Sequence, residues 1–304
     1  MMKIKTVDAW EILDSRGRPT VAATLTLDDG TAATVSVPSG ASTGRAEAKE
    51  LRDGGTRFRG LGCRRAVANI QGPIASVLKN ASFESQEQLD NRLLELDGTP
   101  DKSQLGANAI LAVSLGFARA AAAQQHLELF AYFASLLPAG APRLPDLTIN
   151  LFSGGKHAFG QVAIQDVLVV PRSGTNMLER LAQTYDVYQE AAAIIRKRYS
   201  APALTADEGG LAPPFADSSE MLETAIEAIQ AAEYELGTQV ALAVDVAASH
   251  FVSSGGMYQL DQRSFAPEEL IQHISGWVEY YPLVSVEEGL AEEDWSHWPA
   301  LRQT

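Results

Sequence analysis

The sequence feature that most constrains the fold is residues 240–251, VALAVDVAASHF, in which five apolar residues precede Asp245. A continuous apolar run without polar alternation is typical of a strand buried on both faces, as in a parallel α/β sheet. A carboxylate at the end of such a strand is costly to bury unless a metal, a ligand or a base neutralises it. In α/β barrels the carboxyl ends of the strands form the rim that carries the active site.

The same arrangement recurs at residues 283–288, LVSVEE, where a second apolar run ends in Glu287 and Glu288. A helix N-cap or a surface turn would account for either carboxylate alone, but the repetition favours a shared cation site. We therefore predict that Asp245 and Glu287 lie at the ends of two neighbouring buried strands, within reach of one metal ion.

Length, charge and cysteine content exclude several classes of protein. The 304 residues allow one large or two medium-sized domains with a substantial core. The net charge of −14 argues against nonspecific binding to nucleic acid or to an anionic membrane. The single cysteine, Cys63, rules out an internal disulfide, and no stretch has the length of a signal-peptide core or a membrane span. We expect a cytoplasmic protein with no nucleic-acid partner and no membrane span.

The first 137 residues read as three strands followed by a helical region. An Asp-Asp-Gly turn at residues 28–30 joins two β-rich runs as a hairpin. Further along, apolar residues recur at i, i+3 and i+4, which indicates helices. The predicted strands are Lys3–Leu13, Thr20–Leu27 and Thr31–Val37, and the predicted helices are Arg64–Leu78, Gln86–Leu96 and Asn108–Ala134.

Residues 37–44, VPSGASTG, separate the strands from the helices. Small and hydroxyl residues of this kind can bring the backbone close to a ligand or move as a lid, although a simple loop is the commoner explanation. We expect residues 39–44 of this loop to be mobile without ligand.

A second region follows the linker PAGAP at residues 138–142 and alternates strands with helices. The predicted strands are Leu147–Asn150, Val167–Val170 and the runs ending at Asp245 and Glu287; the predicted helices are Met177–Tyr199, Ser218–Leu236 and one near Pro267–Tyr280.

Eight motifs, in this order, resemble those of the enolase family. They are DSRG (14–17), VPSGASTG (37–44), ELRD (50–53), GANAILAVSL (106–115), GGKHA (154–158), DEGG (207–210), DVAAS (245–249) and VSVEE (284–288). The resemblance implies an α+β N-terminal domain at residues 1–137, followed at residues 143–304 by an enolase-type α/β barrel with the order ββαα(βα)n. It also implies a cytoplasmic, homodimeric glycolytic lyase that uses Mg²⁺ to dehydrate 2-phosphoglycerate, a small phosphorylated acid, to phosphoenolpyruvate.

This chemistry demands particular groups. Water loss begins with removal of a weakly acidic proton next to a carboxylate, and the dianionic intermediate needs concentrated positive charge. Sites of the enolase superfamily use a Lys or His base with one or two Mg²⁺ ions, and an acid must protonate the departing hydroxide. The resemblance implies Asp245 and Glu287 on the tighter Mg²⁺, Ser42 on the second, Glu208 as general acid, and His157, Gln165 and Asp166 as substrate contacts.

Without the resemblance, His157 would be read as a surface histidine, Glu208 as a solvated loop acid and Gln165 as a core amide. The sequence departs from the family pattern at two places, and the first of them bears on catalytic efficiency or substrate choice. Asp166 stands where the family has the longer glutamate, and a carboxylate withdrawn by about an ångström loses much of its benefit. Glu288 and Gly289 replace the Asp-Pro of many enolases.

The second region is short for a barrel of typically ~250 residues. We count four barrel strands, so we expect an incomplete barrel without the third metal carboxylate, the lysine base and its partner lysine, and the His-Arg-Ser phosphate loop. Three interpretations stay open: a truncated or split enolase completed by a C-terminal half, an enzyme for a phosphonate or phosphinate analogue, and a non-catalytic binding protein.

Overall fold

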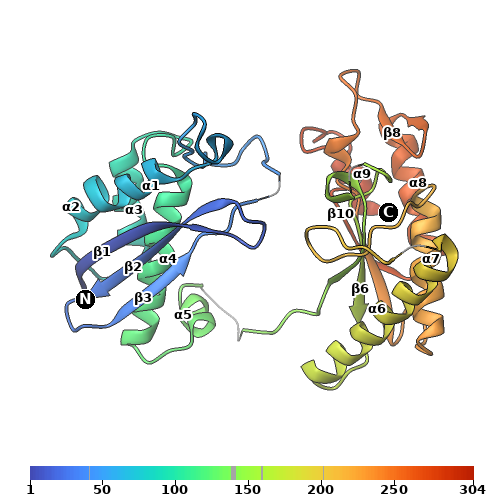
Figure 1. The fold of residues 1–304 in the computed structure, drawn as a ribbon, viewed down its shortest axis with the longest axis horizontal. Helices are drawn as coiled ribbons and strands as arrows, with labels where there is room; N and C mark the ends of the chain where they lie inside the picture. Colours follow the sequence, from blue (N-terminus) through green and yellow to red (C-terminus); the bar gives the residue numbers. More distant parts are fainter. Residues whose placement is uncertain (41, 138–141, 159, 201) are drawn as a thin grey trace. The chain divides into compact units, whose positions relative to one another are not determined.

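The computed structural model describes residues 1–304 except residues 41, 138–141, 159 and 201 and the side chain of His157. The chain separates into two compact units, Met1–Arg143 and Leu144–Thr304 (Figure 1).

The first unit is built on an antiparallel sheet with the strand order β3-β2-β1-β4. The three predicted strands form within one residue of their expected limits, and the Asp-Asp-Gly turn joins β2 to β3 with Gly30 at a φ of 91°. Such a left-handed backbone favours glycine. The strands are β1 (Met2–Leu13), β2 (Pro19–Leu27), β3 (Ala32–Ser36) and β4 (Ser82–Phe83).

Helices pack against one face of this sheet and enclose a single core (Figure 1). Gly116 lets the longest of them lie close to the sheet, since a Cβ there would be 3.4 Å from Leu25 Cβ. The helices are η1 (Arg57–Gly60), α1 (Arg64–Asn69), the π-helical η2 (Ile70–Ile74), α2 (Ala75–Leu78), α3 (Gln86–Asp97), α4 (Ala107–Gln124) and α5 (Leu129–Ser135). The predicted helix Arg64–Leu78 is thus continuous but contains a π-helical segment at Pro73, which has no N–H to donate.

The prediction of one helix over Asn108–Ala134 is wrong, because α4 and α5 are separate. The amides of His126 and Leu127 donate to the carbonyls of Ala123 and Ala122, and His126 has a φ of 55°. This is the Schellman arrangement that ends helices. The Ala-rich α4 itself is buried against the sheet, and in the described residues no helix is long and apolar enough to cross a membrane.

The second unit holds a mixed sheet with the strand order β10-β7-β6-β5. β5 and β7 both run antiparallel to β6, whereas β10 runs parallel to β7. Two helices connect β6 to β7 and one connects β7 to β10, so the order begins ββαα, as the resemblance implies. The elements are β5 (Ile149–Ser153), β6 (Asp166–Pro171), α6 (Met177–Tyr199), α7 (Ser218–Ala231), β7 (Val240–Asp245), α8 (Pro267–Tyr280) and β10 (Leu283–Glu287).

Several smaller elements of this unit have no counterpart in the predicted pattern. They are η3 (Gly155–Ala158), η4 (Ala248–His250), the hairpin β8 (Tyr258–Leu260) and β9 (Arg263–Phe265), and α9 (Trp298–Gln303). They are too short to show a hydrophobic period. The helix predicted to reach Leu236 ends at Ala231.

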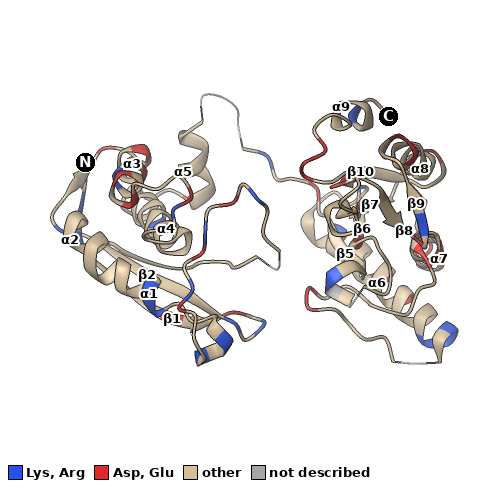
Figure 2. Ribbon diagram, turned by 90° about the horizontal axis from the view of Figure 1, so that it is seen from above, with Lys and Arg blue, Asp and Glu red and all other residues tan. Residues whose placement is uncertain are grey.

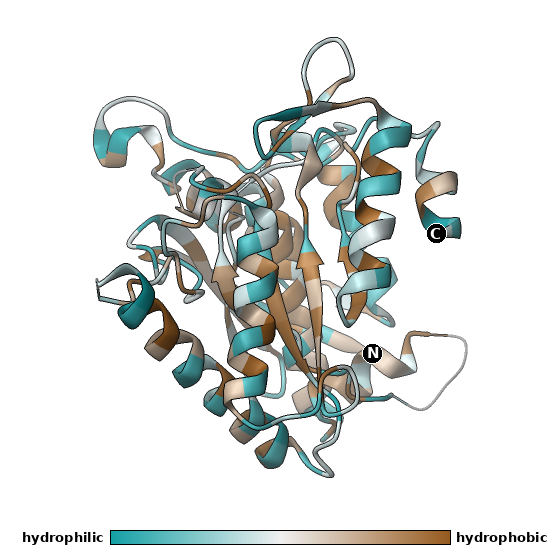
Figure 3. Ribbon diagram, turned by 90° about the vertical axis from the view of Figure 1, so that its right-hand side faces the viewer, coloured by the Kyte–Doolittle hydropathy of each residue, from teal (hydrophilic) through white to brown (hydrophobic). Residues whose placement is uncertain are grey.

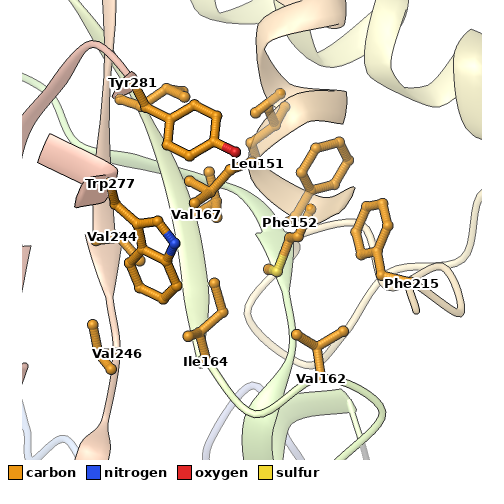
Figure 4. Close-up of a cluster of buried hydrophobic side chains, with 14 of the residues drawn as sticks. Leu151, Phe152, Val162, Ile164, Val167, Phe215, Val244, Val246, Trp277 and Tyr281 are labelled. Atoms are coloured by element: carbon orange, nitrogen blue, oxygen red, sulfur yellow. The ribbon is translucent and has the colours of Figure 1, made fainter. Parts of the chain in front are cut away.

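β7 is buried on both faces, which confirms the prediction from its unbroken apolar run. Val240, Leu242 and Val244 belong to the large core beneath the helices, where Phe152 and Phe215 pack edge to face with ring centroids 5.0 Å apart (Figure 4). The alanines between these residues belong to a small cluster on the other face. Figure 3 shows the hydrophobic strands beside helices that carry both hydrophilic and hydrophobic residues.

β10 is more exposed to solvent than its apolar sequence predicts. In the described residues it pairs only with β7, and Val284 is 48% exposed, so the prediction that this strand is buried is wrong. An apolar groove of about 980 Å³ runs along it, lined by residues that include Trp295 and Trp298. The strand therefore leaves backbone groups available for pairing on its outer side.

Candidate active site

Three carboxylates form a row at one edge of the second sheet. Asp245, the last residue of β7, is the register partner of Asp166 at the start of β6 and of Glu287 at the end of β10. Register partners on neighbouring strands, which lie roughly 4.8 Å apart, project to the same face. Asp166 is buried, Asp245 is partly buried and Glu287 is exposed. Asp245 and Glu287 thus end neighbouring strands, as the two apolar runs suggest.

The electrostatic environment of Asp245 disfavours its ionised form. Burial, and then the like charges of Glu287, Glu288 and Asp166, raise its pKa to about 6. Opposing this, Gln165 Nε2 donates to Asp245 Oδ2 at 2.9 Å. The chain from β10 to α9 adds further acidic residues (Figure 2). A bound cation would reverse this repulsion and favour the ionised carboxylate.

Glu208 is connected to the row through one amide. Asn150 Nδ2 on β5 donates to Asp166 Oδ1 at 3.2 Å and to Glu208 Oε2 at 3.4 Å. Ser153 Oγ also donates to Asp166 Oδ1, at 2.6 Å. The loop that carries Glu208 is held against β5, because the amide of Ser153 donates to the carbonyl of Leu211 at 2.9 Å. The candidate acid and the carboxylate row therefore belong to one hydrogen-bonded assembly.

Gly210 allows this loop to approach β5. A Cβ at Gly210 would lie 2.3 Å from Ser153 Oγ and 3.2 Å from its backbone nitrogen. Gly210→Ala is therefore expected to displace Ser153 from Asp166 and to lower the free energy of unfolding by about 1–3 kcal/mol. Denaturant unfolding measures this loss. Gly276→Ala in α8 is the control, because no atom lies within 4 Å of its Cβ; equal losses in the two variants would contradict the role given to Gly210.

The three other predicted residues are Gln165, Ser42 and His157. The side-chain amide of Gln165 donates to the Asp245 carboxylate, and the backbone amide of Gln165 donates to the Asp245 backbone carbonyl at 3.0 Å. Ser42 is an exposed residue of the first unit, whereas the carboxylate row belongs to the second. The side chain of His157 lies outside the described residues, although its backbone belongs to η3. The roles of all seven residues stay predictions.

Sequence reasoning missed Asn150 and Ser153. Both lie on β5, and neither carries a signal by itself, since a strand amide and a strand hydroxyl are common. Their spacing from GGKHA and their place on the strand next to Asp166 become informative only when the antiparallel pairing of β5 with β6 is known.

Comparison with family models covers nearly the whole chain. Residues 4–133 match the enolase N-terminal domain, and residues 142–304 match the enolase C-terminal TIM barrel domain. The chain belongs to the enolase family. The family supports a lyase of the enolase superfamily, and it fits the α+β first unit and the ββαα start of the second.

The donor set fits a Mg²⁺ ion of the kind that enolase-family domains usually use. Carboxylates are hard oxygen ligands, and Mg²⁺ keeps several waters while binding one or two carboxylates. Asp245 and Glu287 supply two on adjacent strands, and the raised pKa of Asp245 marks a site short of positive charge. Within the described residues no three His, Cys, Asp or Glu side chains converge closely enough to hold a metal, so two carboxylates are the set to test.

Proposed function

We propose that this enolase-family chain takes part in the Mg²⁺-dependent, reversible dehydration of 2-phosphoglycerate to phosphoenolpyruvate, in cytoplasmic glycolysis. One observation carries the proposal: Asp166, Asp245 and Glu287 are aligned across three strands, and Asn150 joins this row to Glu208. A metal site and a proton donor beside one another are what loss of water from a carboxylic acid requires.

Each group has a defined part in this proposal. Asp245 and Glu287 would hold Mg²⁺, and Ser42 would hold a second ion. The bound ions supply positive charge for the substrate carboxylate when its α-proton leaves. Gln165 fixes Asp245 through its 2.9 Å hydrogen bond, and Glu208 gives a proton to the departing hydroxide. His157 and Asp166 contact the substrate.

The proposal also includes a partner. The motifs provide an acid and part of a metal site but no base for the α-proton, so we propose that a complementing C-terminal half supplies it. The exposed outer side of β10 supports this, because an unpaired edge strand with apolar residues accepts another strand.

A second candidate is an enolase-like reaction on a phosphonate or phosphinate analogue. The position of Asp166 favours it. This side chain is one methylene shorter than the family's glutamate, is 4% exposed, and accepts hydrogen bonds from Ser153 and Asn150. A carboxylate drawn towards β5 leaves more room beside the substrate than a glutamate would.

Ligand-dependent unfolding tests both candidates without requiring turnover. With Mg²⁺ present, 2-phosphoglycerate at about 100 times its dissociation constant is expected to raise the free energy of unfolding by about 2.7 kcal/mol. The phosphinate analogue is measured in parallel, and the tighter ligand identifies the substrate class. Glu279→Gln is the control, because this exposed side chain ends α8, near the opposite end of β10 from Glu287. Stabilisation by neither ligand would favour a non-catalytic binding protein.

A further inference from the structure

Ser39, which lies three residues before Ser42, is held from two sides in the first unit. Arg16 Nη2 donates to the Ser39 carbonyl at 2.5 Å, and Arg52 Nη2 donates to Ser39 Oγ at 2.8 Å. The Arg16 side chain is only 16% exposed and is itself fixed by Asp14. A residue anchored through both its backbone and its side chain cannot shift without breaking charge-assisted hydrogen bonds.

Arg52 is the centre of this arrangement. Its Nη1 donates to the carbonyls of Pro19 and Leu61 at 2.7 and 2.9 Å and lies 3.1 Å from Cys63 Sγ. Its Nη2 contacts Glu50 at 2.5 Å as well as Ser39. The guanidinium thus connects the start of β2, the segment before α1 and the loop that begins at Ser39. A lysine could not reproduce this planar fork of donors.

Glu50 brings the two ends of the loop together. Ser39 Oγ donates to Glu50 Oε2 at 3.2 Å, although the two residues are separated by eleven positions. The backbone next to Glu50 is fixed too, because the Lys49 amide donates to Asp101 and the Lys49 carbonyl accepts from Ala107, each at 2.8 Å. The hydrogen bond between Ser39 and Glu50 therefore closes the base of the loop. We call this pair of residues the neck, and Arg52 binds both of them.

The distance from the neck to Ser42 is short. A Cβ at Gly40 would lie 2.7 Å from the Ser42 carbonyl oxygen, so Gly40, which follows Ser39 directly, lies close against Ser42. A displacement of Ser39 therefore moves a residue that lies against Ser42.

We propose that Arg52 is a positioning residue, which fixes Ser39 against Glu50 and thereby sets where Ser42 lies. The role of Ser42 as a metal ligand rests on the proposed function, whereas the anchoring of Ser39 does not. The sequence predicts that residues 39–44 are mobile without ligand; the hydrogen bonds from Arg16 and Arg52 anchor the first of these residues, Ser39.

The test follows a nitroxide attached through Thr43→Cys, next to Ser42. Thr43 is exposed, while Cys63 is fully buried, so the label is directed to position 43. Electron paramagnetic resonance of the full chain then reports local motion. Arg52→Gln is expected to increase the label's rate of motion by roughly threefold or more, and Arg52→Lys to give an intermediate rate, because lysine keeps the charge but not the fork. Ser39→Ala, which deletes one hydroxyl, is expected to act in the same direction as Arg52→Gln and serves if that variant does not fold.

Arg57→Gln is the matched control. Arg57 also binds carboxylates of this unit, but its ion pairs go to Glu11 and Asp53 rather than to the loop. Label motion that is unchanged in the Arg52 and Ser39 variants, or raised equally by Arg57→Gln, would overturn the positioning role. Finally, Mg²⁺ and 2-phosphoglycerate are added to the labelled Thr43→Cys protein that carries no other substitution. An unchanged spectrum in that sample would count against Ser42 as a metal ligand. The comparison of the Arg52, Ser39 and Arg57 variants decides the role of Arg52 independently.

Discussion

Replacing Asp245 with asparagine is expected to stabilise the metal-free protein at pH 8 by up to about 3 kcal/mol. The pKa of Asp245 is raised to about 6 by burial and by Glu287, Glu288 and Asp166, whereas a free aspartate titrates near 3.8. Each pKa unit corresponds to roughly 1.4 kcal/mol. Asparagine keeps an oxygen that can accept from Gln165 but carries no charge into the acidic row.

The pH dependence follows from the direction of this shift. Between about pH 4 and pH 6 the folded state holds the Asp245 proton and the unfolded state does not. The contribution of Asp245 to the free energy of unfolding of the metal-free protein is therefore largest at acidic pH. This contribution is lost as pH rises through 6. Thermal unfolding of the wild type and Asp245→Asn across pH 4–8 is expected to diverge between about pH 4 and pH 6 and to stay apart above that. Parallel curves would refute the electrostatic assignment.

The same substitution is expected to remove the response to metal. Mg²⁺ neutralises the repulsion in the wild type, so it raises the unfolding midpoint. Asp245→Asn removes both a carboxylate ligand and the central charge of the row, so that rise is lost. Glu279→Gln, at the far end of α8, is expected to respond to Mg²⁺ as the wild type does. Retention of the Mg²⁺ effect in Asp245→Asn would place the metal elsewhere.

The second large effect concerns turnover. The polypeptide of residues 1–304, assayed alone with saturating Mg²⁺ and 2-phosphoglycerate, is not expected to form phosphoenolpyruvate at ordinary enzyme rates of ~1–10³ s⁻¹. Glu208 supplies a candidate acid, but no residue matched by the motifs is a base. Loss of a positioned base lowers a rate by about 10²–10⁴-fold, and an incomplete metal site lowers it further.

The assay follows phosphoenolpyruvate formation by the purified chain over a range of protein concentrations. Turnover in the ordinary range, abolished by Glu208→Gln, would show that the chain contains a base that the motifs do not reveal. Activity that appears only after addition of a complementing C-terminal half would instead support the proposed partner.

Much of this fold could be predicted because its signals are local. The unbroken apolar run before Asp245 specifies a strand buried on both faces, and β7 is such a strand. The run before Glu287 is apolar apart from Ser285 but does not specify burial, because burial depends on what pairs with the other side of β10. The sequence also does not predict the end of α4. His126 adopts a left-handed backbone and ends the helix without the glycine that usually marks such an end.

The candidate site was predictable only in part. Motif residues such as Asp245 and Glu208 stand out in the sequence, but the groups that connect them do not. Asn150 reaches Asp166 and Glu208 across sixteen and fifty-eight positions, and Arg16 reaches Ser39 across twenty-three. Contacts of this range arise from strand pairing and loop closure, which no periodicity encodes.

The central position of β7 has a consequence for the order in which the sheet forms. β5 and β6 are separated by residues 154–165, whereas residues 172–239 lie between β6 and β7. Closing the longer segment costs about 1.5 kcal/mol more chain entropy by the logarithmic dependence on loop length. β7 therefore joins late, although it is the strand that brings Asp245 between Asp166 and Glu287. A nascent chain holds the β5–β6 hairpin before it holds the row of carboxylates, so the mutual repulsion of these charges arises only after most of the core is available to resist it.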